Sequence, residues 1–246
     1  MKDAVINTNW FSGIRKQLES FKEISVNSNW YKVYQLPNDT LAICEPYHFQ
    51  EVISFLIFGK ESALLLDTGM GVEKIKPLVD SLCTLPYTVV NTHTHFDHIG
   101  GNYEFENVLV YKTEKNFEKL QKGIPFEDVA DQIFDGCNAI DFPKGFDPCS
   151  YHIQSSIPKK LDVEFFDLGE RRIKVISTPG HCDDAIMLVD EKNKVLFTGD
   201  TFYPATLYAH FLNEKGENSL NQYAKTMEEL AKQYDDYTLY LSLIHI

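Results

Sequence analysis

The stretch NTHTHFDHIGG, residues 91–101, brings three histidines and one aspartate within six positions. Imidazole nitrogens and carboxylate oxygens are the ligands that divalent metals such as zinc prefer in proteins. Residues two apart in an extended loop face the same side, so His93 and His95 are predicted to hold one ion. Asp97 and His98 then point toward a second position. The spacing favours a metal site over a chance cluster on a solvated loop.

Two later segments supply further candidate ligands. TPGH presents His181 after a predicted strand and a Pro-Gly turn, and FTGD ends another strand with Asp200. Each segment alone is a weak signal, because a histidine or aspartate at a strand end is more often a capping or solvated group. Together with the first stretch, His181 completes a set of three histidines for one metal, and Asp200 can bridge to the second position.

Strands and a helix must position these residues. Short runs rich in β-branched and aromatic residues predict strands at 30–36, 40–45, 51–59 and 62–67. Apolar residues at helical spacing predict a helix over 72–85, although Pro77 argues against an unbroken helix. A buried strand at 87–93 then leads straight into the histidines. We expect them in the loop at its carboxyl end, where α/β proteins bind ligands.

The second half of the chain repeats the β pattern. Residues 112–160 show no clear period and are expected to form a helix with long loops that border or cover a site. Further strands are predicted at 107–111, 171–178, 185–190, 194–200 and 237–242, with a helix at 219–234. The chain thus mixes strands and helices throughout, as an α/β or α+β protein does.

Composition limits the classes of partner. The chain has 246 residues, 43% hydrophobic and 24% charged, which is typical of a soluble globular protein, and we expect one domain over 1–246. A formal net charge of −13 repels phosphate backbones and argues against nucleic acid as a partner. No apolar run reaches the length of about 18 residues that spans a membrane, so we expect no membrane partner. The five scattered cysteines favour reduced thiols, so we expect a cytoplasmic location.

The motifs HTHFDH, TPGH and FTGD, with the upstream LLLDTG, resemble those of the metallo-beta-lactamase superfamily in kind and in order. The resemblance covers nearly the whole sequence. It implies a four-layer αββα sandwich, in which two sheets pack face to face with helices outside and a metal site at one edge. It also implies ligand roles: the first metal by His93, His95 and His181, the second by Asp97 and His98, and Asp200 between them.

The function that this resemblance implies is a metallo-hydrolase, most simply with two zinc ions; iron and manganese are the alternative metals. Two ions about 3.5–4 Å apart would produce a metal-bound hydroxide as the nucleophile. Asp97 is the expected catalytic residue, because it can orient the hydroxide as well as bind metal. With Asp200 as the bridge, the chain is similar to the glyoxalase II and lactonase branches, which implies a small ester-like substrate such as a thioester or lactone. Gly100 and Gly101 fit a tight turn whose N–H groups help to orient an anion.

Two other functions stay open. The first is an iron-dependent oxidoreductase of the same fold, although the flavodiiron pattern usually carries glutamate where this chain has His95. The second is an incomplete, non-catalytic metal-binding module. It is motivated by the far end of the chain, where the superfamily usually supplies a last histidine just after the final strand. Here that strand leads into SLIHI, and His245 is a doubtful ligand because it comes late. We expect that the chain is truncated there and that the tail is foreign.

Three more residues adjoin the candidate ligands in sequence. Tyr203 and His210 follow Asp200 and are candidate substrate contacts; for Tyr203, core packing is an equal alternative. Cys182 follows His181, and we interpret it as a small buried cysteine rather than a reactive thiol. Neither the identity of the substrate nor the oligomeric state follows from the sequence.

Overall fold

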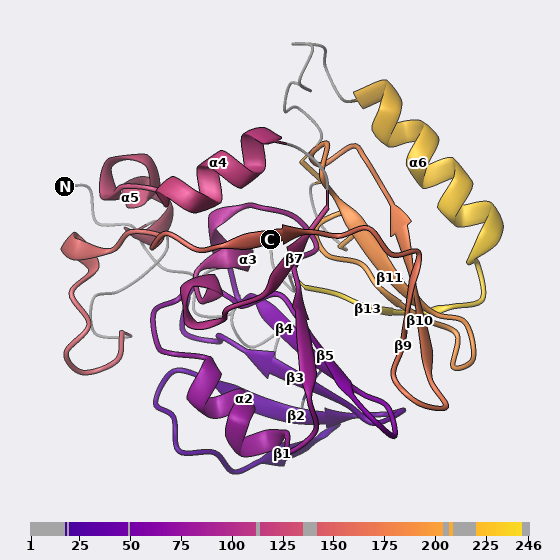
Figure 1. The fold of residues 1–246 in the computed structure, drawn as a ribbon, viewed down its shortest axis with the longest axis horizontal. Helices are drawn as coiled ribbons and strands as arrows, with labels where there is room; N and C mark the ends of the chain where they lie inside the picture. Colours follow the sequence, from indigo (N-terminus) through magenta and orange to yellow (C-terminus); the bar gives the residue numbers. More distant parts are fainter. Residues whose placement is uncertain are drawn as a thin grey trace.

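The computed structural model describes residues 18, 20–48, 50–111, 114–134, 142–203, 207–208 and 220–242. In this part of the chain, two β-sheets pack face to face, and helices lie on their outer sides (Figure 1). This arrangement confirms the αββα sandwich that the family resemblance implies.

The first sheet keeps its strands in chain order. Within the described residues it contains β1 Lys22–Ile24, β2 Lys32–Leu36, β3 Thr40–Cys44, β4 Ile53–Phe58, β5 Ala63–Leu66, β6 Tyr87–Val90, β7 Val108–Val110 and β8 Pro158–Lys160. Neighbouring strands are antiparallel from β1 to β5 and parallel from β5 to β8. Because β5 and β6 are parallel, their carboxyl ends lie at the same edge, where α/β sheets bind ligands.

The second sheet has the spatial order β13-β12-β11-β10-β9. Its strands are β9 Phe165–Asp167, β10 Arg172–Ser177, β11 Ile186–Asp190, β12 Val195–Phe197 and β13 Thr238–Tyr240. All pairs are antiparallel except β12 with β13, which are parallel. The carboxyl ends of β10 and β12 therefore lie at one edge of this sheet.

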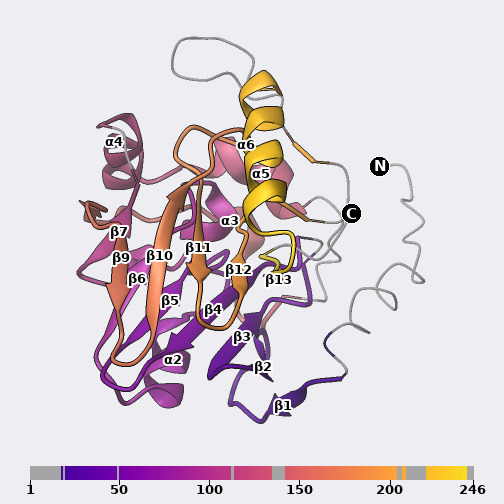
Figure 2. The same cartoon turned by 90° about the vertical axis from the view of Figure 1, so that its right-hand side faces the viewer.

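Helices cover both outer faces. They are α2 Lys76–Leu82, α3 Phe96–Ile99, α4 Glu114–Lys122, α5 Phe126–Phe134 and α6 Leu220–Gln233, with short 3₁₀ turns η1 Asn102–Glu104 and η2 Pro148–Ser150. Helix α2 is shorter than predicted, because Pro77 occupies its first turn, where a missing N–H breaks no intrahelical bond. Figure 2 shows α6 lying along the second sheet, on the side away from the first sheet.

Successive side chains of the first sheet point to opposite faces and pack in two separate hydrophobic cores. In β5, Leu65 packs in the core shared with α2, α4 and α5, whereas Leu64 and Leu66 pack in the core between the sheets. In that second core, the rings of Phe55 and Phe197 join the two sheets with centroids 5.3 Å apart. A sheet that is buried on both faces explains why its strands read as nearly continuous apolar runs.

The strands β1, β8 and β9 are not predicted by the sequence pattern. Each is three residues long and contains charged residues, so none stands in the apolar run that marks a strand in the sequence. Pro158 and the two lysines of β8 also disfavour a strand, yet a proline is tolerated at a sheet edge. The rest of the described part of 112–160 forms α4, α5 and long loops, as expected.

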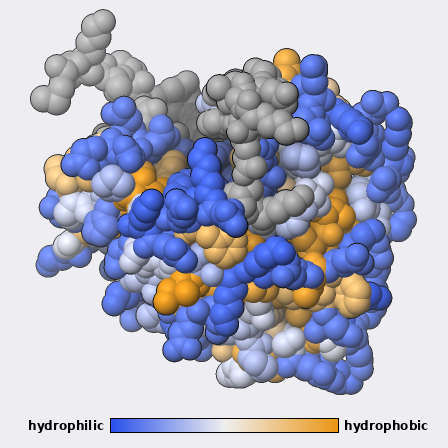
Figure 3. Space-filling model, turned by 45° about the horizontal axis from the view of Figure 1, so that its top comes forward, coloured by the Kyte–Doolittle hydropathy of each residue, from blue (hydrophilic) through white to orange (hydrophobic). Residues whose placement is uncertain are grey.

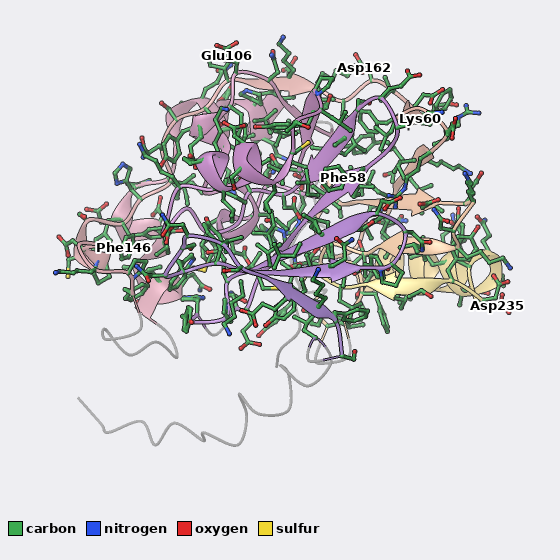
Figure 4. All side chains as sticks on the ribbon, turned by 90° about the horizontal axis from the view of Figure 1, so that it is seen from below. Phe58, Lys60, Glu106, Phe146, Asp162 and Asp235 are labelled. Carbon is green, nitrogen blue, oxygen red and sulfur yellow. The ribbon has the colours of Figure 1, made fainter. Side chains whose placement is uncertain are left out.

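Figure 3 shows one face of the molecule, on which hydrophilic side chains cover most of the surface with smaller apolar patches between them. Among the described residues, no helix has both the length and the apolar character to cross a bilayer. Figure 4 labels Lys60 in the turn that joins β4 to β5, and β5 runs from this turn toward the candidate site at its other end.

Candidate metal centre

Four strand ends bring the candidate ligands together. Asp67 follows β5, the histidine stretch follows β6, His181 follows β10 and Asp200 follows β12. The Ile186 N–H donates to the Thr92 carbonyl across 2.9 Å, which joins the second sheet to the histidine stretch. Ligand-type residues from both halves of the chain therefore meet at one edge of the sandwich.

The histidine stretch changes conformation part-way along. His95 is extended, with φ −74° and ψ 155°, and it caps α3, a single turn that contains Asp97 and His98. The histidines are expected in a loop, whereas the structure places His98 within this single helical turn. The His98 N–H donates to the His95 carbonyl across 3.1 Å, and this bond closes the turn. The turn directs both Asp97 and His98 inward, where 3% and 0% of their surfaces are exposed.

Two glycine-containing turns touch behind α3. A Cβ atom at Gly100 would lie 2.1 Å from the Met70 carbonyl, so a side chain cannot fit there. The Gly100 N–H donates to the Gly69 carbonyl across 2.7 Å. The Gly100 N–H therefore already has a partner within the fold, and an anion-orienting role for the other N–H group of this turn, that of Gly101, stays a prediction.

Three histidines form the first group of possible ligands. One nitrogen from each of His93, His95 and His181 lies, together with Cys182 Sγ, within 4.8 Å of the others. His181 Nε2 is 2.9 Å from His95 Nδ1, and the ring centroids of His93 and His181 are 5.0 Å apart. The three histidines predicted to share the first metal are thus neighbours in space.

His98 and Asp200 form a second group together with His93. Asp200 Oδ1 lies 3.1 Å from His98 Nε2, and Asp200 Oδ2 lies 3.5 Å from His181 Nε2. Asp97 Oδ2 lies 3.6 Å from His98 Nε2, at the margin of this group. Asp200 therefore lies close to members of both groups, and its role as a bridging ligand stays a prediction.

The protonation of these residues depends on burial and on neighbouring charges. Burial, followed by the charges of the neighbouring histidines, holds the pKa of His93 well below its usual value, so this ring is neutral. Burial alone would also lower the pKa of His98, but the carboxylates of Asp200, Asp97 and Asp67 outweigh it and raise that pKa well above the usual value. Three carboxylates around one imidazole thus create a site for positive charge.

The donor atoms fit a metal ion. His93 Nε2, His98 Nε2 and Asp200 Oδ1 are buried and make no well-aligned hydrogen bond among the described residues, although His98 Nε2 and Asp200 Oδ1 lie 3.1 Å apart. An unsatisfied buried polar atom costs about 1–3 kcal/mol, and a bound cation would satisfy all three atoms. Imidazole and carboxylate ligands suit zinc, and they also accommodate iron or manganese.

Asp67 and Thr92 contact the Nδ1 atoms of the His98 and His93 rings, which leaves the Nε2 atoms directed toward the ligand groups. Asp67 Oδ2 lies 2.8 Å from His98 Nδ1, and Asp67 Oδ1 accepts the Thr92 N–H across 2.7 Å. The Thr92 hydroxyl donates to Asp67 Oδ2 and lies 3.0 Å from His93 Nδ1. One carboxylate therefore orients both histidines. The LLLDTG motif marks Asp67 in the sequence, but only the structure assigns it this role.

Helix α6 holds the turn that carries His181. The Thr226 hydroxyl donates to the Pro179 carbonyl across 2.6 Å, and the Tyr223 hydroxyl donates to the Thr201 carbonyl. A Cβ atom at Gly180 would lie 2.4 Å from Tyr223 Cδ2, so glycine allows this close approach. The helix thereby fixes the turn on which His181 is presented.

Comparison with known proteins establishes the family. The family model described as Metallo-beta-lactamase superfamily matches residues 51–226, more than two thirds of the chain. The chain belongs to the metallo-beta-lactamase superfamily. The resemblance inferred from the motifs is thus confirmed.

Relatives within the superfamily include enzymes. Acyl-coenzyme A thioesterase MBLAC2 of Homo sapiens is 29% identical over 196 residues, which cover 74% of this chain and 67% of that protein. A metallo-beta-lactamase fold-containing protein of Sulfurisphaera tokodaii is 29% identical over 172 residues, which cover 63% of this chain and 59% of that protein.

Solved structures agree with the fold. The MIM-2 metallo-beta-lactamase has a TM-score of 0.60 at 14% identity, with 94% of this chain and 83% of that chain covered. A metallo-beta-lactamase family protein from Thermus thermophilus has a TM-score of 0.57 at 21% identity, with 85% and 74% covered. At these identities the likeness shows the superfamily fold.

The sequence does not identify Lys119 as a residue of the site, but the structure places it against the histidine stretch. Lys119 lies on α4, and its Nζ donates to the Thr94 carbonyl, inside the histidine stretch, across 2.7 Å. Burial lowers the pKa of Lys119, while the carboxylate of Asp184 raises it. A lone lysine on an amphipathic helix carries no sequence signal for such a contact. Cys182 is half-buried at the first group, closer to the candidate ligands than its interpretation as a packing residue implies.

The remaining candidates have different outcomes. Tyr203 is fully buried in the core, and its hydroxyl accepts the Tyr208 N–H across 3.3 Å. A substrate contact by Tyr203 stays a prediction. His210 and His245 lie outside the described residues, so their roles also stay predictions.

Proposed function

We propose that this chain is a zinc-dependent hydrolase with two metal positions, and that its substrate is a thioester, with lactones and similar small esters as the next class. The observation that carries the proposal is the convergence of unsatisfied buried donor atoms from His93, His98 and Asp200 at the edge of the sandwich. The thioester is preferred because a relative is named an acyl-coenzyme A thioesterase.

The proposed ligand sets are those that the family resemblance implies, and the proximity of their members supports them. His93, His95 and His181 would hold the first metal, His98 and Asp97 the second, with Asp200 between them. The imidazole nitrogens and carboxylate oxygens of this set are typical zinc ligands. Bound zinc supplies Lewis-acid polarisation of the substrate carbonyl and lowers the pKa of a water molecule.

Asp97 is the proposed proton carrier. Burial raises its pKa to about 6; the charge of His98 opposes this rise, and the charge of Asp200 adds to it. A carboxylate beside the attacking water can accept its proton and return it to the leaving sulfur. Its place on α3, one residue before His98, keeps the carboxylate beside the ligands.

The experiment compares hydrolysis of a panel of acyl-coenzyme A thioesters and simple lactones by the zinc-loaded wild-type chain and by Asp97→Asn. The expected result is thioester hydrolysis by the wild type and a kcat at least about 100-fold lower for the variant, the scale of a lost general base. The exposed His152 provides a matched control, since His152→Asn should keep the wild-type rate.

The metal content of each preparation is measured in parallel, because Asp97 is also a proposed ligand. If Asp97→Asn holds the same zinc and keeps the wild-type kcat, the role of Asp97 is wrong. If the fully loaded wild type hydrolyses none of the panel, the proposed function is wrong.

A further inference from the structure

Two hydrogen bonds connect Tyr203 to His181 through the backbone of Tyr208. The Tyr208 N–H donates to the Tyr203 hydroxyl oxygen across 3.3 Å, and the Tyr208 carbonyl oxygen lies 3.2 Å from His181 Nδ1. Tyr203 follows β12 and His181 follows β10, and β11 lies between these strands in the sheet. Tyr208 therefore joins the segment that begins at Asp200 to the turn that carries His181.

The chemistry of the partners fixes the direction of both bonds. A backbone N–H only donates and a backbone carbonyl only accepts, so the bond to Tyr208 requires a proton on His181 Nδ1. In a neutral imidazole the lone pair is then on Nε2. His181 Nε2 lies 2.9 Å from His95 Nδ1 and 3.5 Å from Asp200 Oδ2, in the first ligand group. The contact with Tyr208 thus leaves the nitrogen that faces the ligand group able to bind a metal.

The hydroxyl of Tyr203 is a fixed acceptor because the segment before it is anchored. Tyr203 belongs to the core that the first sheet shares with α2, α4 and α5, and none of its surface is exposed. Two residues earlier, the Thr201 N–H donates to the Thr198 carbonyl across 3.1 Å. The Thr201 hydroxyl lies 2.8 Å from the Thr178 hydroxyl, at the end of β10. A buried ring on an anchored backbone can therefore hold Tyr208 in one position.

We propose that Tyr203 is a positioning residue of the metal centre. Its hydroxyl holds the Tyr208 backbone, and the Tyr208 carbonyl sets the tautomer and the orientation of His181. This inference rests on the metal centre of the proposed function, and it gives Tyr203 no contact with the substrate. Metal-binding histidines usually donate their other N–H to an acceptor of this kind, and its loss costs about 10–100-fold in metal affinity.

The acceptor for His181 is a backbone atom, so substitution of the Tyr208 side chain does not remove it. The side chain of Tyr208 is 42% exposed, whereas its N–H and carbonyl make the two bonds. Tyr203→Phe is the informative change, because it keeps the buried ring and removes only the hydroxyl oxygen. The Tyr208 N–H then loses its acceptor, and the carbonyl is no longer held toward His181.

Zinc affinity of the full chain, measured by competition with a chelator, gives the first test. Tyr203→Phe should bind zinc about 10–100-fold more weakly than the wild type. Tyr87→Phe is the matched control, because it also removes one bonded hydroxyl, which donates to Asp80 Oδ1 across 2.7 Å at the start of β6. This control should keep the wild-type affinity. Equal affinities for all three proteins overturn the proposal.

The tautomer of His181 gives a second test, which a purely structural role of Tyr203 would not change. Nitrogen NMR of the histidine side chains distinguishes the two tautomers, and His181→Gln assigns the signal. In the metal-free wild type the proton should be on Nδ1, and in Tyr203→Phe it should be divided between both nitrogens. An unchanged tautomer in the variant overturns the proposal. If Tyr203→Phe fails to fold, the wild-type spectrum decides, because a proton on Nε2 also overturns it.

Thioester hydrolysis separates a positioning role from a substrate contact. At a zinc concentration that fills both proteins, Tyr203→Phe should recover the wild-type kcat and KM, because its defect is in metal binding. A variant with the wild-type zinc affinity and a lower kcat would indicate a substrate contact and overturn the proposal. A zinc-loaded wild type that hydrolyses no thioester contradicts the proposed function, whereas the affinity and tautomer results still test the role of Tyr203. The two failures are therefore distinguishable.

Discussion

Asp67 Oδ2 lies 2.8 Å from His98 Nδ1, and neither side chain is exposed to solvent. This contact fixes the tautomer and the orientation of the imidazole, so that His98 Nε2 faces Asp200. The carboxylate stands at the end of β5, whereas the histidine follows β6. The geometry of the second ligand group therefore depends on the pairing of two adjacent parallel strands.

Replacement of Asp67 by asparagine should weaken metal binding. The amide would keep the shape of the side chain but lose the negative charge that orients His98, and loss of such an outer contact costs roughly 10–100-fold in metal affinity. Competition with a chelator measures the affinity. The control is Asp162→Asn, at an exposed aspartate in the loop between β8 and β9, which should bind the metal with the wild-type affinity. Equal affinities for all three proteins would contradict the role of Asp67.

Replacement of Lys119 by methionine should destabilise the chain. Methionine keeps the apolar stem but cannot donate to the Thr94 carbonyl, and the loss of one such bond costs about 1 kcal/mol. Urea unfolding of the metal-free protein measures the loss. Lys115 lies exposed on the same helix, so Lys115→Met should leave the free energy of unfolding unchanged. If both variants unfold alike, Lys119 does not hold the histidine stretch.

Replacement of Gly180 by alanine should disturb the His181 turn. The new Cβ would lie 2.4 Å from the Tyr223 ring, and such overpacking costs about 1–3 kcal/mol. Movement of the turn away from α6 would also displace His181 from the first ligand group. Thermal unfolding with and without zinc tests this, and the variant should gain less stability from zinc than the wild type. A full zinc-dependent gain would show that the turn tolerates the change. Lys225→Ala, on the exposed side of α6, serves as the control.

The stability of the metal-free chain should carry a pH dependence from Glu45. This carboxylate is buried, and it accepts the Trp30 indole N–H across 2.5 Å and the Met70 N–H across 2.8 Å. Burial outweighs both bonds and raises the pKa of Glu45 from 4.5 to about 7. Between these values the folded state keeps a proton that the unfolded state has lost, so stability falls as the pH rises.

Glu45→Gln isolates this effect, because glutamine does not titrate. The difference in unfolding free energy between the wild type and the variant should be larger at pH 4.5 than at pH 8, by at most about 3 kcal/mol. Urea unfolding at both values measures it. A difference that does not change with pH would place the pKa of Glu45 near its ordinary value.

The ligand cluster could be predicted from the sequence because its residue types are rare and close together. His93, His95 and His98 stand in one short stretch, and the strand patterns before His181 and Asp200 place those residues at strand ends. The four layers of the fold were implied by the resemblance of the motifs to the superfamily, whereas the apolar runs predicted the positions of most buried strands.

Other parts of the site depend on packing between distant segments. The contact of Lys119 with the Thr94 carbonyl requires α4 to lie over the histidine stretch, and no local pattern encodes that approach. Helix α3 is a single turn, too short to show a helical period. The strand β8 is held by its pairing with β7, although its own residues disfavour a strand.

The dependence of the His181 turn on α6 has a consequence for synthesis on the ribosome. The histidine stretch, Asp67 and Thr92 are translated early, whereas Thr226, which bonds to the Pro179 carbonyl, comes much later. At about 5–20 residues per second, this interval is on the order of ten seconds. During that time the nascent chain has the histidine stretch but no fixed His181 turn. An ion bound then would gain His181 as a ligand only after α6 has left the exit tunnel.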